Sequence, residues 1–355
     1  MRKSILTLAT TLFSCSLYSF SVCNWLIPVD ISLDIGAGYR RDNFKFETVA
    51  DRNNSSRNYY GYDYDFDSFS YDYGTEYSDK FYPVYTSVLD WNDLNIAFIE
   101  GRGKCVVLNS FYFRGGGDYG LICNGLNIDD DYVHAYDSSP SRKLISKSTS
   151  NTNGFVYDID IAAGYQFSFF NFSVAPLIGY AWKGQNMHDT DLKQNEIRNY
   201  SGELYSFGSG SNGCSISGLS SKYNARWNGP FIGFDSEVDF LCFGSCMLNY
   251  EFHWGEYHAN AIWNLRNDMP GGFKHHAKNS YGHVVDLGYK YNFCDYWTVG
   301  LHGGFQYFRA NHGRDITVLE SAYHGNVSGK NIQTIELRKV QWYSYNVSMD
   351  IGLVF

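Results

Sequence analysis

The sequence ends in the stretch LRKVQWYSYNVSMDIGLVF, residues 337–355. Successive side chains of an extended strand point to opposite faces, so alternate residues of this stretch share a face. From Tyr343 onward one face is wholly apolar, and it carries Tyr343, Tyr345, Val347, Met349, Ile351, Leu353 and Phe355. The other face is small or polar up to its last residue, Val354. An apolar face with tyrosines at one end and a terminal aromatic residue at the other is typical of a membrane-spanning β-strand edged by aromatic girdles.

Composition limits the class of protein to which the chain belongs. The chain has 355 residues, of which 18% are aromatic, with 35 glycines and only 6 prolines, and its mean hydropathy is −0.34. Beyond the N-terminus there is no run of about 18 apolar residues, which excludes membrane-spanning helices as the main architecture. The formal net charge of −9 is far from the basic surface that holds nucleic acid, so no nucleic-acid partner is expected.

The N-terminal residues 1–21 have the layout of a secretory signal peptide, with a basic pair, an apolar run and then small residues. Ser19-Phe20-Ser21 is an acceptable cleavage site, so cleavage near Val22 is expected. The alternative is a lipoprotein signal with Cys15 acylated, to which Leu12-Phe13-Ser14 is a poor match. Both alternatives predict export from the cytoplasm, where disulfides are permitted.

Apolar and polar residues alternate in about ten segments after the signal peptide. The clearest internal segment is 154–169, in which Phe155, Tyr157 and Ile159 alternate with Asp158 and Asp160. The connections between segments alternate strictly between long and short. The long ones are residues 48–78, 118–153, 185–221, 266–280 and 311–336, and the short ones lie near residues 101, 170, 243 and 294.

This order predicts an all-β fold, a transmembrane antiparallel up-and-down β-barrel of about ten strands that comprises residues 22–355. Its long loops would lie outside the cell, and its short turns and both termini would lie in the periplasm. The alternative is a soluble, secreted β-sandwich, whose turns would not sort by length onto alternate ends.

Five runs of residues resemble one known family: 91–94 (WNDL), 164–166 (GYQ), 176–180 (PLIGY), 225–233 (ARWNGPFIG), and 253–257 (HWGEY) continuing to 263–266 (WNLR). They are similar to the Protochlamydia-type outer membrane protein family, whose members resemble omptins in strand number. The resemblance extends roughly from Trp91 to Phe355 and is weaker in the N-terminal third. It implies an omptin-like barrel in the outer membrane of chlamydia-like or other Gram-negative bacteria, with pore formation proposed for some members.

The terminal Phe355 resembles the C-terminal signal of such barrels. The resemblance implies that the barrel assembly machinery recognises this residue. Outer-membrane lipid and that machinery are therefore the expected partners.

With the apolar face of each strand directed to lipid, the other face lines the lumen. This assignment gives an acidic lumen whose principal residues are Asp158, Asp160, Asp235, Glu237, Glu251, Asp286 and Lys290. Ten strands leave at most a narrow passage, because barrels of about eight strands are filled by their own side chains. The sequence therefore predicts a porin-like narrow channel that prefers cations and passes small ions or solutes. The alternative is a non-conducting surface or adhesive barrel.

The resemblance to omptins, which are surface endopeptidases, makes an enzyme the remaining alternative. Omptin chemistry implies a carboxylate pair and an Asp-x-His arrangement at the outer rim. Asp129-Asp130-Asp131 could supply the carboxylates, but the nearest approach to the partner motif is Glu256-Tyr257-His258, which lacks the Asp. We therefore expect no enzymatic activity.

Cysteines and histidines give no strong ligand pattern. Cys242, Cys246 and Cys294 are expected near neighbouring periplasmic turns, where they could form a disulfide within the chain or with another envelope protein, or stay unpaired. Cys242 and Cys246 lie four residues apart, but no second cysteine or histidine pair at zinc spacing accompanies them, so no structural metal or cofactor is predicted. His275-His276, and His312 with Asp315, are expected in outer loops, where a weak divalent-metal contact is conceivable but a histidine without a role is more common.

Overall fold

The computed structural model describes residues 28–50, 84–134, 142–198, 213–240, 244–267, 269–294, 296–321 and 329–355. The predicted signal peptide and Cys242 lie outside these ranges. The described residues include no helix that is long and apolar enough to cross a membrane.

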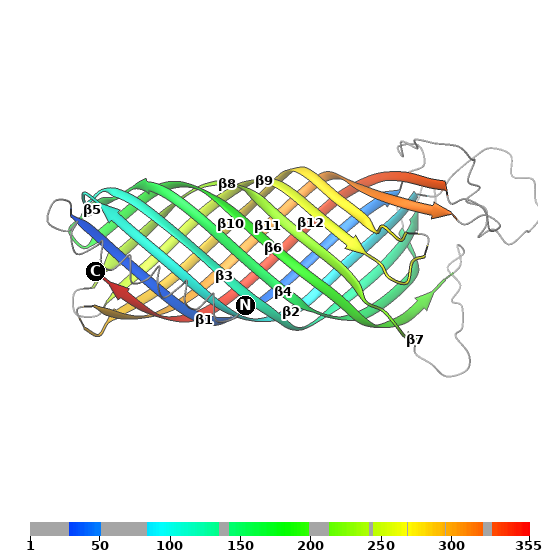
Figure 1. The fold of residues 1–355 in the computed structure, drawn as a ribbon, viewed down its shortest axis with the longest axis horizontal. Helices are drawn as coiled ribbons and strands as arrows, with labels where there is room; N and C mark the ends of the chain where they lie inside the picture. Colours follow the sequence, from blue (N-terminus) through cyan, green and yellow to red (C-terminus); the bar gives the residue numbers. More distant parts are fainter. Residues whose placement is uncertain are drawn as a thin grey trace, which may run out of the picture.

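Ten long strands form one closed antiparallel sheet, as predicted (Figure 1). They are β1 (Val29–Ala50), β2 (Val84–Val107), β3 (Phe111–His134), β4 (Arg142–Tyr165), β6 (Phe172–Ile197), β8 (Ser221–Asp239), β9 (Ser245–Ile262), β10 (Phe273–Asn292), β11 (Trp297–Ser321) and β12 (Gly329–Val354). Each strand pairs with its neighbours in the chain, and β1 pairs with β12, which closes the barrel. Two short strands, β5 (Phe167–Phe169) and β7 (Cys214–Ile216), both pair with β6.

Short turns gather at one end of the barrel, which is the end where the C-terminus lies (Figure 1). The turn between β5 and β6 lies at residues 170–171, and the turn between β10 and β11 includes Cys294, both as predicted. The turn predicted near residue 101 is wrong. Strand β2 continues to Val107, which pairs with Val29, and the chain turns at Leu108 and Asn109, both with positive φ. Residues 101–103 are therefore strand, and Arg102 and Lys104 line the barrel interior.

The strands extend well beyond the expected membrane segments. They contain 18 to 26 residues, whereas crossing a bilayer takes about 9–11. Most of the expected loops 118–153 and 311–336 is strand, β6 continues to Ile197 within the expected loop 185–221, and β10 already begins at Phe273 within the expected loop 266–280. Strand β1 likewise continues to Ala50. The predicted bounds of the long loops are therefore too wide.

A change in the phase of alternation explains these longer strands. On β1 the outward residues are apolar as far as Tyr39 and then become polar at Arg41 and Lys45. The inward residues change the opposite way, from polar Arg40 to apolar Phe44. Below the change the outer face of the strand contacts lipid, and above it the outer face contacts water. Outward residues are therefore apolar below and polar above, and inward residues change in the opposite sense.

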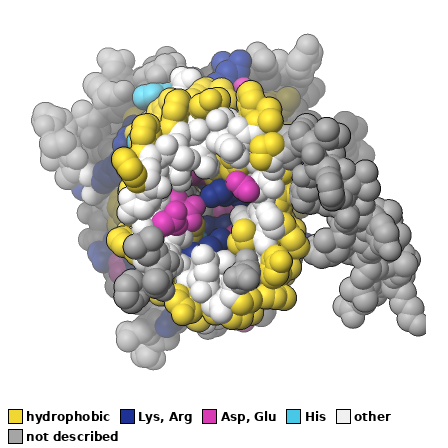
Figure 2. All heavy atoms as spheres, turned by 90° about the vertical axis from the view of Figure 1, so that its left-hand side faces the viewer, with side chains coloured by type: hydrophobic (Ala, Val, Ile, Leu, Met, Phe, Trp, Pro, Cys, Tyr) yellow, Lys and Arg dark blue, Asp and Glu magenta, His cyan; other side chains and the backbone are white. Residues whose placement is uncertain are grey.

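A belt of exposed apolar side chains surrounds the lower part of the barrel. Figure 2 shows hydrophobic side chains around the ring and charged side chains in its opening. Met349, 63% exposed, lies within the belt. Exposed aromatic side chains edge the belt, with Tyr39, Tyr119, Trp182, Trp254 and Tyr343 above, and Phe111, Tyr165, Phe169, Tyr291, Trp297 and Phe355 below. This arrangement is that of lipid-facing strands flanked by two aromatic girdles.

Candidate functional site

A polar cavity opens inside the barrel at the end with the short turns, which in outer-membrane barrels is the periplasmic end (Figure 2). It has a volume of about 390 Å³ and is lined by eleven carboxylates and six cationic side chains. All seven residues predicted to line the lumen contribute to it: Asp158, Asp160, Asp235, Glu237, Glu251, Asp286 and Lys290.

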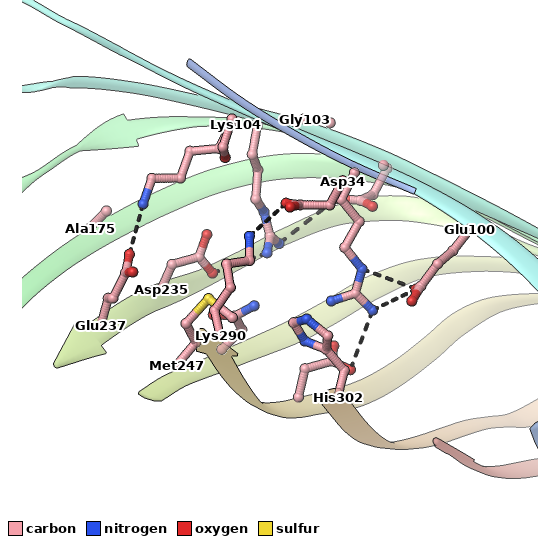
Figure 3. Close-up of a pocket in the computed structure, with 18 of the residues that line it drawn as sticks. Asp34, Glu100, Gly103, Lys104, Ala175, Asp235, Glu237, Met247, Lys290 and His302 are labelled. Carbon is pink, nitrogen blue, oxygen red and sulfur yellow. Dashed lines mark hydrogen bonds and ion pairs between the residues drawn. The ribbon is translucent and has the colours of Figure 1, made fainter. Parts of the chain in front are cut away.

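The cations of this cavity are engaged in ion pairs across the barrel (Figure 3). The Lys104 ammonium lies 2.9 Å from a carboxylate oxygen of Glu237, and the Lys290 ammonium lies 2.7 Å from one of Asp34. These pairs join strands that are not neighbours in the sheet, so they tie opposite walls together.

Arg114 sits at the centre of a second group. Its guanidinium donates to Asp235 at 3.0 Å and also to Glu251. Glu251 in turn accepts a hydrogen bond from His253 in the tautomer or charge state that protonates Nε2. The carboxylate that was expected to face an open passage is therefore held between two partners.

A third, fully buried group closes the upper end of the cavity. The Arg40 guanidinium donates to both carboxylate oxygens of Asp42, at 2.8 and 2.9 Å, and to Asp158 at 3.0 Å. The Lys183 ammonium lies 3.5 Å from Asp158 and donates to Gln306 at 3.0 Å. Charges taken out of water are stable only with such multiple partners.

Sequence reasoning missed three of the six cations, Arg102, Lys104 and Arg114. Arg102 was assigned to a turn. Because that turn was placed too early in the chain, the alternation of strand residues did not identify Lys104 and Arg114 as facing the interior. The signal that locates the turn correctly is Asn109-Ser110, which is polar and lies between the apolar runs Val106-Val107 and Phe111-Tyr112-Phe113.

Above this polar cavity the interior is filled by apolar side chains, which we call the aromatic core. Each of the ten long strands contributes at least one residue that is no more than 4% exposed: Phe44, Trp91, Ile122, Val156, Met187, Tyr223, Tyr257, Ala277, Phe308 and Trp342. The rings pack closely, with centroids 4.5 Å apart for Trp227 and Tyr257, 5.0 Å for Trp91 and Tyr223, and 5.1 Å for Phe308 and Trp342. Residues lining a water-filled passage would be exposed to solvent, and these are not.

The acidic run at the outer rim divides between the two faces of β3. Asp129 shares the inward parity of buried Asn127, and burial raises its pKa well above the usual range of a carboxyl. Asp130 faces the other way and pairs with Lys147 at 3.1 Å. On β9, Tyr257 is fully buried inside the barrel, so its neighbours Glu256 and His258 lie on the outer surface. The barrel wall therefore separates the inward carboxylates from this histidine.

The two other histidine groups singled out from the sequence, His275-His276 and His312 with Asp315, are also not brought together in the structure. His275 is buried inside the barrel, where its Nδ1 lies 2.8 Å from the Tyr223 hydroxyl and its Nε2 lies 3.5 Å from an Asp315 oxygen. His276 faces outward beside His258. His312, 82% exposed, lies 3.3 Å from Glu336 rather than next to Asp315.

Of the predicted disulfide and assembly residues, the described ones, Cys246, Cys294 and Phe355, lie at the periplasmic rim. Cys246 and Cys294 carry free thiols. Phe355 exchanges two backbone hydrogen bonds with Ile31, at 2.9 and 3.1 Å. The last residue of the chain is thus part of the ladder that closes the barrel.

A closed ten-stranded barrel with a lipid-facing belt between aromatic girdles and a charged interior defines an outer-membrane β-barrel protein. Residues 34–355 match the family described as Protochlamydia outer membrane protein, and the chain belongs to that family. Its location is the outer membrane, as predicted.

Solved structures show the fold to be omptin-like. The outer membrane protease OmpT from Escherichia coli is similar with a TM-score of 0.66 and 14% sequence identity, over 92% of this chain and 97% of that chain. The outer membrane protein OprG from Pseudomonas aeruginosa reaches a TM-score of only 0.28 at 7% identity, over 91% of this chain and 95% of that chain. No curated protein sequence matches this chain.

Proposed function

We propose that this protein is a surface barrel of the outer membrane that does not conduct solutes through its lumen. The observation that carries this proposal is the aromatic core, to which all ten long strands contribute residues no more than 4% exposed. A polar solute or hydrated ion would have to displace these side chains in order to pass.

Packing energetics support a closed state. Each aromatic pair contributes about 0.5–1.5 kcal/mol beyond the burial of its surface. The aromatic core contains several such pairs, among them Trp91 with Tyr223 and Trp227 with Tyr257. Opening a passage would also leave buried polar groups such as the Asp189 carboxylate without the Trp91 indole that donates to it at 3.1 Å. Thermal opening would therefore be rare.

The second candidate is the porin-like, cation-preferring channel that the sequence predicts. The excess of carboxylates over cations around the periplasmic cavity favours it, since an acidic, narrow space concentrates cations. In the closed barrel the same excess makes the cavity a dead-ended vestibule that holds cations from the periplasm.

We further propose that the barrel is not a peptidase. A histidine that activates water must reach solvent on the same side as its carboxylates. His258 lies outside the barrel, while Asp129 points inside. His275 shares the interior with Asp129 but is only 2% exposed and is engaged with Tyr223 and Asp315.

Conductance in planar bilayers tests the main proposal. The refolded full chain should give no discrete steps in KCl at about 1 M or about 0.1 M, while a general porin run in the same bilayers gives steps. Discrete, cation-selective steps that lose their selectivity in the double variant Glu251→Gln/Asp286→Asn would overturn it in favour of the channel. Cleavage of basic peptides that is lost in Asp129→Asn would overturn the proposal on peptidase activity.

A further inference from the structure

Three side chains capable of binding a metal converge on the outer surface of the barrel, at β9 and β10. Glu256, His258 and His276 each offer a ligand atom, and these atoms lie within 4.8 Å of one another. The distances from the Glu256 Oε2 atom to the Nε2 atoms of His258 and His276 are 3.0 and 3.8 Å. Neither the family description nor the omptin-like fold assigns a role to this cluster.

The sheet register brings the three together. His258 and His276 are direct partners across the antiparallel ladder, and Glu256 lies two residues before His258 on the same face. Trp254, two residues earlier on that face, belongs to the upper aromatic girdle. The cluster therefore lies just above the lipid-facing belt, where water reaches it, and the side chains of Glu256, His258 and His276 are 52%, 42% and 35% exposed.

The two imidazole rings are stacked, with centroids 4.4 Å apart and planes 9° apart. Both rings direct Nε2 towards the Glu256 carboxylate, and imidazole nitrogen is a common ligand of transition-metal ions. The Glu256 carboxylate lies beside the rings and is hydrogen-bonded to His258 at 3.0 Å.

The spacing fits one tetrahedral ion. With metal–nitrogen and metal–oxygen bonds of about 2.0–2.1 Å, tetrahedral donor atoms lie about 3.3–3.4 Å apart. The two distances from Glu256 bracket this value. Because the side chains are partly exposed, modest rotations of the histidine rings would bring their lone pairs onto a common point.

We propose that Glu256, His258 and His276 form a surface site for a divalent transition-metal ion such as Zn²⁺, with water as the fourth ligand. Bound there, the ion would join β9 to β10 at the level where the barrel leaves the membrane. Cationic neighbours limit the affinity of the site for a metal ion. On the flanking strands, Arg226 is the ladder partner of His258 and Arg314 is that of His276. The positive charge of Lys278 also interacts with the Glu256 carboxylate. Three ligands in such surroundings correspond to micromolar rather than nanomolar binding.

The test uses the full chain folded in detergent micelles, with its thiols alkylated so that cysteine does not bind the metal. Titration calorimetry with zinc chloride at about pH 7.5 should show one equivalent of micromolar affinity, which weakens as the pH is lowered because protons compete with the metal for its ligand atoms. His258→Ala and His276→Ala should each weaken binding at least about tenfold. His312→Ala, which removes an exposed histidine outside the cluster, is the matched control and should bind as the parent does.

Electron paramagnetic resonance with Cu²⁺ gives a second measurement. The spectrum of the parent should show coupling to two imidazole nitrogens, and that of either single variant to one. Unchanged folding of the variants is checked by heat-modifiable migration. Equal zinc affinity of the parent and the double variant His258→Ala/His276→Ala, or no zinc binding up to about 1 mM, would overturn the proposal.

Discussion

Truncating Trp342 to alanine tests the aromatic core where it meets the polar cavity. The indole is fully buried, stacks on Phe308 with centroids 5.1 Å apart, lies 5.2 Å from the Arg40 guanidinium, and donates to Asp42 at 3.0 Å. A buried tryptophan removes about 200 Å² from water, worth about 5 kcal/mol at about 25 cal/mol per Å². Core Trp→Ala changes measured in other proteins lower the free energy of unfolding by about 3–5 kcal/mol. We expect a loss in that range.

The lost hydrogen bond adds little to this loss, because Asp42 keeps Arg40 and Gln185 as donors. The assay is equilibrium urea unfolding of the barrel refolded in lipid vesicles, followed by tryptophan fluorescence. Trp254→Ala, which removes an exposed girdle residue, is the matched control and should cost much less. The single variant should remain electrically silent, because Trp91 and Tyr223 still close the interior above. A loss no larger than that of the control, or conductance in the single variant, would refute a packed and sealing core.

Three further outcomes are expected. Arg40→Met should lower the free energy of unfolding by about 3–5 kcal/mol, because it leaves the buried Asp42 carboxylate without its cationic partner. Loss of the exposed Arg41 in Arg41→Ala should cost less than about 1 kcal/mol, and equal urea midpoints of the two variants would contradict this. Phe355→Ser should impair assembly without blocking export, seen as lost heat-modifiable migration, and normal migration would count against the C-terminal signal. Burial raises the pKa of Asp189, above the membrane belt, to about 6, so its contribution to stability is complete below about pH 4 and declines by at most about 3 kcal/mol as the pH rises to about 6. Asp189→Asn should remove that decline, and identical pH profiles of parent and variant would exclude it.

The sequence predicts the membrane part of this fold well because one physical rule applies there. Lipid requires an apolar outer face, so the alternation at Tyr343–Phe355 gives both the strand and its facing. The same rule places Asp158 and Glu251 inside, and both line the cavity.

Above the membrane the outer face contacts water and is polar. Predictions that rest on an apolar outer face are therefore wrong there. Phe44 and Phe46 are apolar residues on the inward parity, and Lys45 is a polar residue on the outward parity. When apolar residues are expected on the outer face, such segments are predicted to be loops. The clue was available in the alternation itself, which resumes over residues 43–47 with its phase exchanged.

Pairing within the interior could not be predicted, because it joins strands that are far apart in the chain. Arg114 meets Glu251 across the barrel, and Lys290 meets Asp34. Local periodicity gives the face of each residue but not the height at which it meets the opposite wall, which depends on strand tilt and shear.

The long strands also determine how far the protein stands above the lipid. A strand of 24 residues such as β2, rising about 3.3 Å per residue and tilted by about 40°, spans about 60 Å along the barrel axis. The apolar belt of such barrels takes about 25 Å of that height. The remaining height of about 35 Å extends beyond the apolar belt. It places the outer ends of β1 and β2 beyond the lipid headgroups, where molecules outside the cell can reach them.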